Sequence, residues 1–156
     1  MKKILYLFLI LCINCKSYQT EFIEYENHLP RHTVDKILKS FNAEKEQYSL
    51  LIFTQFFNGE EFIVQNDKRI LLKESIHTIK NFGFAKTVRI NNNYDVIAKD
   101  TDMHTKVLIK SSLAKKYKFI YIEKDKYLKD VVGNDSILNT KKAYKIIYSN
   151  TLLGSM

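Results

Sequence analysis

The chain has 156 residues and a formal net charge of +8, with ten Tyr, ten Phe and no Trp. Its length corresponds to one domain, and its single Pro and four Gly exclude a Pro-rich or low-complexity linker. The four glycines lie far apart, which excludes both glycine-rich nucleotide-binding loops.

The first fifteen residues have the pattern of an export signal. Lys2 and Lys3 precede an unbroken apolar run, Ile4–Ile13, and the polar chain begins after Cys15. A run of ten residues suits the apolar part of a signal peptide, whereas a membrane-spanning helix needs about 20. We therefore predict a signal peptide over residues 1–14 that is removed, not a permanent anchor.

The residues at the end of this signal are Cys12, Ile13, Asn14 and Cys15. They resemble the lipobox of bacterial lipoproteins, roughly Leu-Ala/Ser-Gly/Ala-Cys, and depart from it at Cys12 and Asn14. The resemblance implies that the Cys15 thiol carries a diacylglycerol, that the preceding peptide is cleaved and that the new amino terminus is acylated. A second register would make Cys12 the acceptor.

This resemblance has consequences for location. Two or three acyl chains hold a protein on a membrane essentially permanently, so we expect a lipid-anchored protein of the bacterial cell envelope. Lys16 follows the cysteine where Asp often signals inner-membrane retention, which favours the outer membrane. A simple secreted protein and a buried amino-terminal strand remain the alternatives. Because Cys12 and Cys15 both belong to the signal, their spacing does not predict a redox or metal site.

Positive charge is concentrated in the last third of the chain. Residues 101–156 contain eleven lysines and five acidic residues, whereas basic and acidic residues are equal in number in residues 15–100. Such a region can meet acidic lipid headgroups, an acidic protein or nucleic acid. Export argues against nucleic acid, and a soluble lysine-rich strand face is the simplest interpretation.

The segment 15–30 is predicted to be a lipid-anchored tether or an edge strand, and 31–156 a single β-rich domain. One amphipathic helix is predicted from Thr33 to about Glu46, with Thr33 as its cap and Asp35 in its first turn. Its apolar residues recur at the helical spacing i, i+3, i+4 and i+7, and they are Val34, Ile37, Leu38 and Phe41.

Strands dominate after this helix. Tyr48–Phe57, Glu61–Gln65 and Lys68–Lys73 are predicted to form a three-stranded meander. Asn58-Gly59 would make its first tight turn, because Asn-Gly between apolar runs is a strong hairpin signal. Asn66-Asp67 would make the second turn.

The second half continues in the same way, with a turn at residues 91–93, a loop or helical turn over Ser111–Lys116 and a charged excursion over 124–141. Tyr117–Glu123 has apolar residues on both faces, which predicts a central strand covered on both sides. The other strands expected here are Ser75–Lys80, Phe84–Ile90, Tyr94–Lys99, His104–Lys110 and Lys142–Ser149. Many short strands with frequent turns predict a mainly β fold, an antiparallel β-sandwich, with a small β-barrel as the alternative.

No catalytic residue, metal site or cofactor is predicted. His28 and His32 have zinc-like spacing, but Pro30 between them disfavours a continuous helix. Asp100 and Asp102 resemble a fragment of a calcium loop, yet calcium needs oxygen ligands at further fixed positions, so a turn is predicted.

These observations favour a non-catalytic envelope lipoprotein that acts as a binding or inhibitory module, for example an immunity protein against a toxin or lytic enzyme. Its partner would be a protein or an envelope polymer. The candidate partner-binding residues are Lys115, Lys116 and Lys118 in the basic third, and Asn58 and Glu60 at the predicted hairpin tip.

Two other functions remain open. An envelope hydrolase would need polar residues that converge only in three dimensions. If the first fifteen residues are instead a strand, a basic β-barrel that binds nucleic acid is possible, with Tyr117 and Phe119 stacking on bases between Lys116 and Lys118.

Overall fold

The computed structural model describes residues 18–22, 30–79, 83–124 and 143–152. The predicted signal peptide, Cys15 and nearly all of the predicted charged excursion lie outside the described residues. The elements are β1 (Tyr18–Phe22), α1 (Arg31–Ser40), β2 (Tyr48–Phe53), β3 (Asn58–Asn66), β4 (Arg69–His77), β5 (Lys86–Asn91), β6 (Val96–Asp100), β7 (Thr105–Ile109), α2 (Ser111–Ala114), β8 (Phe119–Lys124) and β9 (Tyr144–Ser149).

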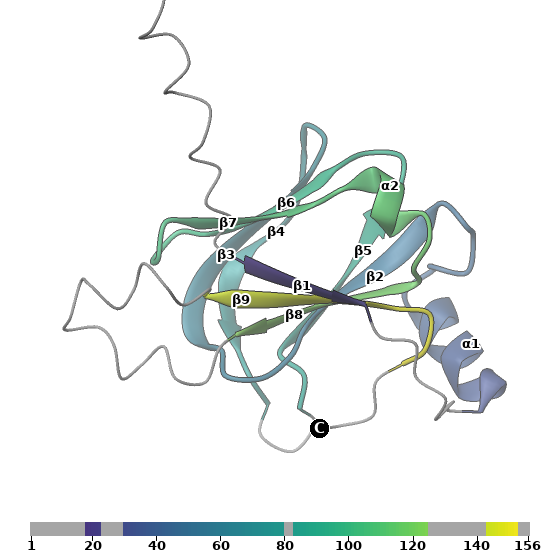
Figure 1. Ribbon diagram of the computed structural model, residues 1–156. Coiled ribbons are helices and arrows are strands. Elements are labelled where there is room, and N and C mark those ends of the chain that lie inside the picture. Colours follow the sequence, from purple (N-terminus) through teal and green to yellow (C-terminus); the bar gives the residue numbers. More distant parts are fainter. Residues whose placement is uncertain (1–17, 23–29, 80–82, 125–142, 153–156) are drawn as a thin grey trace, which may run out of the picture.

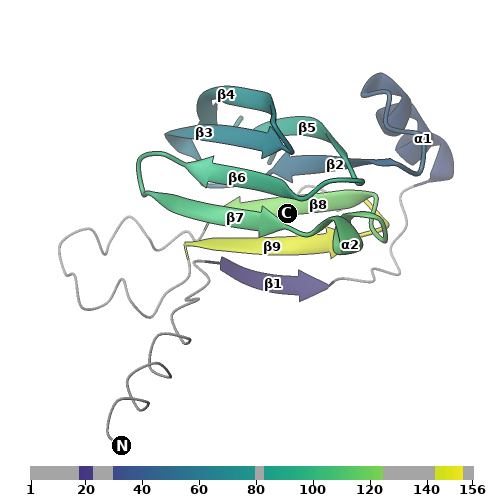
Figure 2. The ribbon, with the colours of Figure 1, turned by 90° about the horizontal axis from the view of Figure 1, so that it is seen from above.

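The strands form two sheets that pack face to face (Figures 1 and 2). Sheet A has the order β1-β9-β8-β2-β5, and sheet B has the order β4-β3-β6-β7. The predicted mainly β sandwich is therefore confirmed. Sheet B is antiparallel throughout, but sheet A is mixed, because β1 pairs parallel to β9 and β2 parallel to β8. Parallel pairing of β2 and β8 is possible because β3 to β7 and α2 intervene and return the chain.

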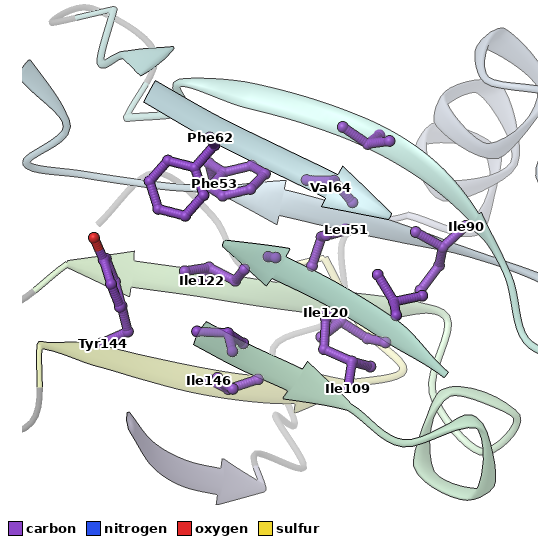
Figure 3. Packing of buried hydrophobic residues seen from close by; sticks show 14 of the residues in the cluster. Leu51, Phe53, Phe62, Val64, Ile90, Ile109, Ile120, Ile122, Tyr144 and Ile146 are labelled. Carbon is purple, nitrogen blue, oxygen red and sulfur yellow. The ribbon is translucent and has the colours of Figure 1, made fainter. Parts of the chain in front are cut away.

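The main core lies between the two sheets, where alternate side chains of both point inward (Figure 3). Phe53 of sheet A and Phe62 of sheet B meet edge to face with ring centroids 5.0 Å apart. Phe57 packs against both rings at similar angles. Such aromatic pairs add stability beyond the area they bury.

β8 lies between β9 and β2, and its apolar residues are buried on both faces. Ile120 and Ile122 belong to the core between the sheets, whereas Phe119 and Tyr121 belong to a second core on the outer face of sheet A. The predicted central strand, covered on both sides, is confirmed, although Tyr117 lies before β8 and packs against the core between the sheets.

The second core is formed under α1, whose Leu38 is buried and whose Val34 and Ile37 are partly buried there. The helix is shorter than predicted: Pro30 is its cap instead of Thr33, and it ends at Ser40. Asn42 adopts a left-handed conformation with φ 51°, and the Ala43 N–H donates to the Leu38 carbonyl at 2.8 Å.

This arrangement at the end of α1 is a Schellman motif, completed by the contact of Ala43 with Leu38 in the second core. Asn42 therefore stops the helix before Glu46. Phe41, predicted to face the core, is instead 37% exposed.

The predicted hairpin at Asn58-Gly59 is wrong. β2 and β3 belong to different sheets, and the chain crosses from one to the other after Phe53. Gly59 has φ 106° and lies at a register shift within the β3–β4 pair. A Cβ there would approach His77 Cε1 to 2.9 Å, so the Asn-Gly signal marks a bulge under close contact.

The other predicted turns are confirmed. β3 and β4 form a hairpin through residues 66–69, where Asp67 has φ 55°. The turn after β5 is stabilised locally, since the Asn93 N–H donates to the Asn91 side-chain oxygen at 3.0 Å.

Candidate functional site

Four polar residues gather at the end of the sandwich where β8 finishes and β9 begins. They are Glu60 of β3, Asp100 of β6, Lys124 of β8 and Tyr144 of β9. Asp100 and Tyr144 are almost completely buried, and the side chains of Lys124 and Glu60 are 8% and 13% exposed. We call these four residues the polar cluster.

Glu60 and Lys124 form an ion pair that joins sheet B to sheet A. The other carboxylate oxygen of Glu60 accepts the Asn58 N–H at 2.6 Å. Burial by itself would raise the pKa of Glu60, but the hydrogen bonds from Lys124 and Asn58 outweigh it and the pKa is lowered. Glu60 is therefore ionised at neutral pH, with both of its oxygens engaged.

Tyr144 donates its phenolic hydrogen to Asp100, which again joins sheet A to sheet B. Burial, followed by the hydrogen bond to Asp100, raises the pKa of Tyr144 well above its usual range. The second oxygen of Asp100 accepts the N–H groups of Asp102 and Met103 at 2.9 and 3.0 Å. The predicted turn at residues 100–102 is confirmed by these bonds.

The polar cluster therefore consists of two side-chain pairs that connect the sheets, with each charged or donor group satisfied by its neighbours. A third connection, between Glu74 of β4 and Lys86 of β5 at 2.5 Å, closes the sandwich on another side. The protonated phenol of Tyr144 and the ionised carboxylate of Glu60 each bond to a residue of the opposite sheet, and these bonds hold the two sheets together.

A different kind of surface lies on the outer face of sheet B. α1 packs on sheet A and α2 packs against the core between the sheets, so no helix in the described part of the chain covers this face. Cross-strand register places two rows of side chains on it. The lysine row is Lys73, Ile63, Lys99 and Lys106, and the aliphatic row is Ile70, Gln65, Ile97 and Leu108.

The rows run across all four strands, and both contain exposed side chains. Ile70 is 57% exposed and Ile97 is 39% exposed. Lys73 and Lys106 are exposed, and Lys99 is half-buried. This face thus combines positive charge with aliphatic surface.

The predicted partner-binding residues do not form one surface. Lys115 and Lys116 are exposed just after α2, at the end of the sandwich where β7 and β9 finish (Figure 2). Asn58 and Glu60 lie at the opposite end, because Glu60 contacts Lys124 at the far end of β8. Within this pair Asn58 is exposed, whereas Glu60 is committed to the polar cluster.

The Lys118 side chain is hydrogen-bonded within the chain and is not available as a partner-binding residue. Its ammonium donates to the carbonyls of Lys45, Tyr48 and two further residues of the loop after α1, at 2.7 to 3.3 Å. Burial lowers the pKa of Lys118. The side chain therefore fastens the loop that follows α1 to the start of β8, and its donors are used within the chain.

Sequence reasoning did not identify Lys124 or Tyr144, nor the pairing of Asp100 with Tyr144. No local signal marks them, because their partners are 64 and 44 residues away in the chain. Lys99 and Ile97 fall on the polar side of the predicted strand Tyr94–Lys99, but only the register with β7 places Lys106 and Leu108 beside them.

Within the described ranges, no group of three or more His, Cys, Asp or Glu side chains is placed to hold a metal ion. The helices found there are also too short and too polar to cross a membrane.

The fold and these surfaces define a two-sheet β-sandwich with a polar cluster at one end and a lysine-bearing outer face of sheet B that no helix of the described residues covers. Comparisons with protein-family models, with curated proteins and with solved structures found no match to this chain.

Proposed function

We propose that this chain is a non-catalytic lipoprotein of the bacterial cell envelope, anchored at Cys15, whose β-sandwich binds or inhibits an envelope partner. An immunity protein that blocks a toxin or a lytic enzyme is one form of this function. The outer membrane is the favoured location, because Lys16 follows the lipid-acceptor cysteine.

The observation that carries the proposal is the position of β1. This strand begins at Tyr18 and pairs with β9 at the edge of sheet A, and only Lys16 and Ser17 separate it from Cys15. A strand in the sandwich so soon after the lipobox-like residues supports a folded module that starts where an export signal would end.

The polar cluster supports the non-catalytic part of the proposal. An acid–base residue must be able to exchange a proton with a bound substrate. Glu60 is instead bound to Lys124, and Tyr144 to Asp100, in contacts that join the two sheets. The partner-binding surface that we favour is the end of the sandwich with Lys115 and Lys116.

The first experiment is intact mass spectrometry of the protein produced in a Gram-negative cell. We expect an amino-terminal Cys15 carrying acyl chains. An unmodified protein that retains Met1 would contradict the anchoring part of the proposal.

The second experiment is affinity capture from solubilised envelope with the acylated protein. The double variant K115Q/K116Q should lose the captured partner, while the matched variant K36Q/K39Q, on the exposed side of α1, should retain it. Equal capture by the two variants would contradict the assigned surface. Lys118 is left unchanged in this test, because its substitution would disturb the loop after α1.

A further inference from the structure

We propose that a second copy of this chain pairs with the outer edge of β1, in an antiparallel arrangement about a two-fold axis at Thr20. The two copies of sheet A then form one continuous sheet. The inference goes beyond the proposed function and does not depend on it, because it needs neither the lipid anchor nor the partner-binding end with Lys115 and Lys116.

β1 is the outermost strand of sheet A, with β9 on one side and no strand of the described residues on the other (Figure 2). Successive residues of a strand direct their N–H and C=O groups alternately to its two sides. The groups of β1 that point away from β9 are a template on which another strand can add. β1 contains neither lysine nor proline, the residues that commonly block such an edge, and Glu21 is its one charged residue.

The two long sides of the sandwich differ in how they are closed. On one side, Glu74 of β4 and Lys86 of β5 form an ion pair at 2.5 Å that joins the sheets. On the side of β1, the Phe22 ring lies 5.8 Å from that of Tyr117 and 5.4 Å from that of Tyr148, at the margin of the core between the sheets. Phe22 is nevertheless 53% exposed, so a side chain from a second copy can cover the part that faces solvent.

The sequence of β1 is suited to pairing with itself. An antiparallel pair centred on Thr20 places the two Thr20 residues opposite each other, and Tyr18 opposite Phe22 of the second copy. Threonine–threonine and aromatic–aromatic pairs across strands both stabilise a sheet. The same register sets Gln19 opposite Glu21, so no like charges are opposed, whereas a centre one residue later would oppose the two Glu21 carboxylates.

The proposed pairing is compatible with a lipid anchor on both copies. A strand pair of this length is a small interface, so we expect weak association in solution. Two-fold symmetry gives both copies of Cys15 the same height along the axis, and Tyr18 is at most about 10 Å from Cys15. Two acylated copies can therefore insert into one membrane leaflet while β1 is paired, and their attachment to one surface raises the effective concentration.

The first test changes the charge at the axis, in the full-length chain with C12S and C15S, which cannot be acylated. Association is measured in nonionic detergent by energy transfer between donor- and acceptor-labelled copies, with the labels at K36C. T20K and T20E each set like charges directly opposite at an exposed position, and each alone should associate about fivefold more weakly than the parent chain. A mixture of T20K with T20E opposes unlike charges and should regain the association of the parent.

The matched controls are N93K and N93E, which introduce the same charges at an exposed position of the turn after β5. Each should associate as the parent chain does, alone or mixed. Equal association of T20K, T20E and their mixture would overturn the proposal, because contact between copies would then come from the apolar leader that all variants share.

The second test determines the register by disulfide cross-linking in the same C12S/C15S background. Directly opposed residues of an antiparallel pair lie within the Cα separation that a disulfide spans. T20C should therefore form linked dimers, and Q19C mixed with E21C should link several times faster than either variant does alone. Equal rates for the mixture and the single variants would overturn the proposal. A dimer formed by exchange of β1 keeps the two Thr20 residues apart, so failure of T20C to link would overturn it as well.

Discussion

The two outer faces of the sandwich differ in what covers them. The outer face of sheet A carries Leu50, Ile52, Phe119 and Tyr121 under α1, whereas that of sheet B carries the lysine and aliphatic rows without a covering helix in the described chain. Strands that are apolar on both sides need a cover, and strands that alternate do not. On the covered side the Lys118 ammonium donates to carbonyls of the chain, whereas on the outer face of sheet B Lys73 and Lys106 are exposed to solvent.

The largest expected effect concerns the buried ion pair between the sheets. Glu60→Gln leaves Lys124 buried without its counter-charge, so we expect the free energy of unfolding to fall by about 3–5 kcal/mol at pH 7. Urea denaturation measures this change. The double variant E60Q/K124M should recover much of the loss, and no recovery would mean that the pair is not the source.

The same pair predicts a dependence on pH. Because the folded-state pKa of Glu60 lies below its usual value of 4.5, its contribution to stability is complete above that value and is lost as the pH falls through the lowered pKa. Wild-type protein should therefore lose stability below pH 4.5 more steeply than E60Q. Parallel acid-unfolding curves would contradict the lowered pKa.

Removal of an apolar side chain should distinguish the two outer faces directly. Leu50→Ala creates a cavity under α1 and should lower the free energy of unfolding by about 2–5 kcal/mol. Ile97→Ala on the open face, where the side chain is 39% exposed, should cost less than about 1 kcal/mol. Similar losses measured by urea denaturation would show that sheet B is also covered.

Two lysines provide the next contrast. Lys118→Met leaves carbonyls of the loop after α1 without their donor and should cost about 1–3 kcal/mol. Lys73→Met, at an exposed position of sheet B, should change stability by no more than about 0.5 kcal/mol. Thermal denaturation of the two variants side by side tests this, and an unchanged melting temperature for Lys118→Met would refute its structural role.

Local pattern predicted the elements well where burial is two-sided or strictly alternating. Tyr117–Glu123 is an example, because its two apolar faces already imply a cover on each side. Local sequence patterns gave wrong predictions where the same short motif occurs in two kinds of structure. Asn58-Gly59 marks a bulge instead of a hairpin, and Asn42 ends α1 where the apolar period alone predicted continuation.

The candidate surfaces were less predictable than the fold. Lys118 belongs to a lysine-rich stretch together with Lys115 and Lys116, yet its ammonium is bound by carbonyls some seventy positions away in the chain. Lys73, Lys99 and Lys106 come from three separate strands and form a row only through the register of β4, β3, β6 and β7. The number of lysines in a stretch of sequence does not tell which of them bond within the folded chain and which are exposed on a sheet face.

The sequence alone determined the mainly β fold, the amphipathic helix and the central strand, because each depends on the order of neighbouring residues. Tertiary structure alone decided which strands share a sheet, which lysines are structural, and how Glu60 meets Lys124 and Tyr144 meets Asp100. These depend on pairings between distant segments, and such pairings follow from burial and register in the folded chain.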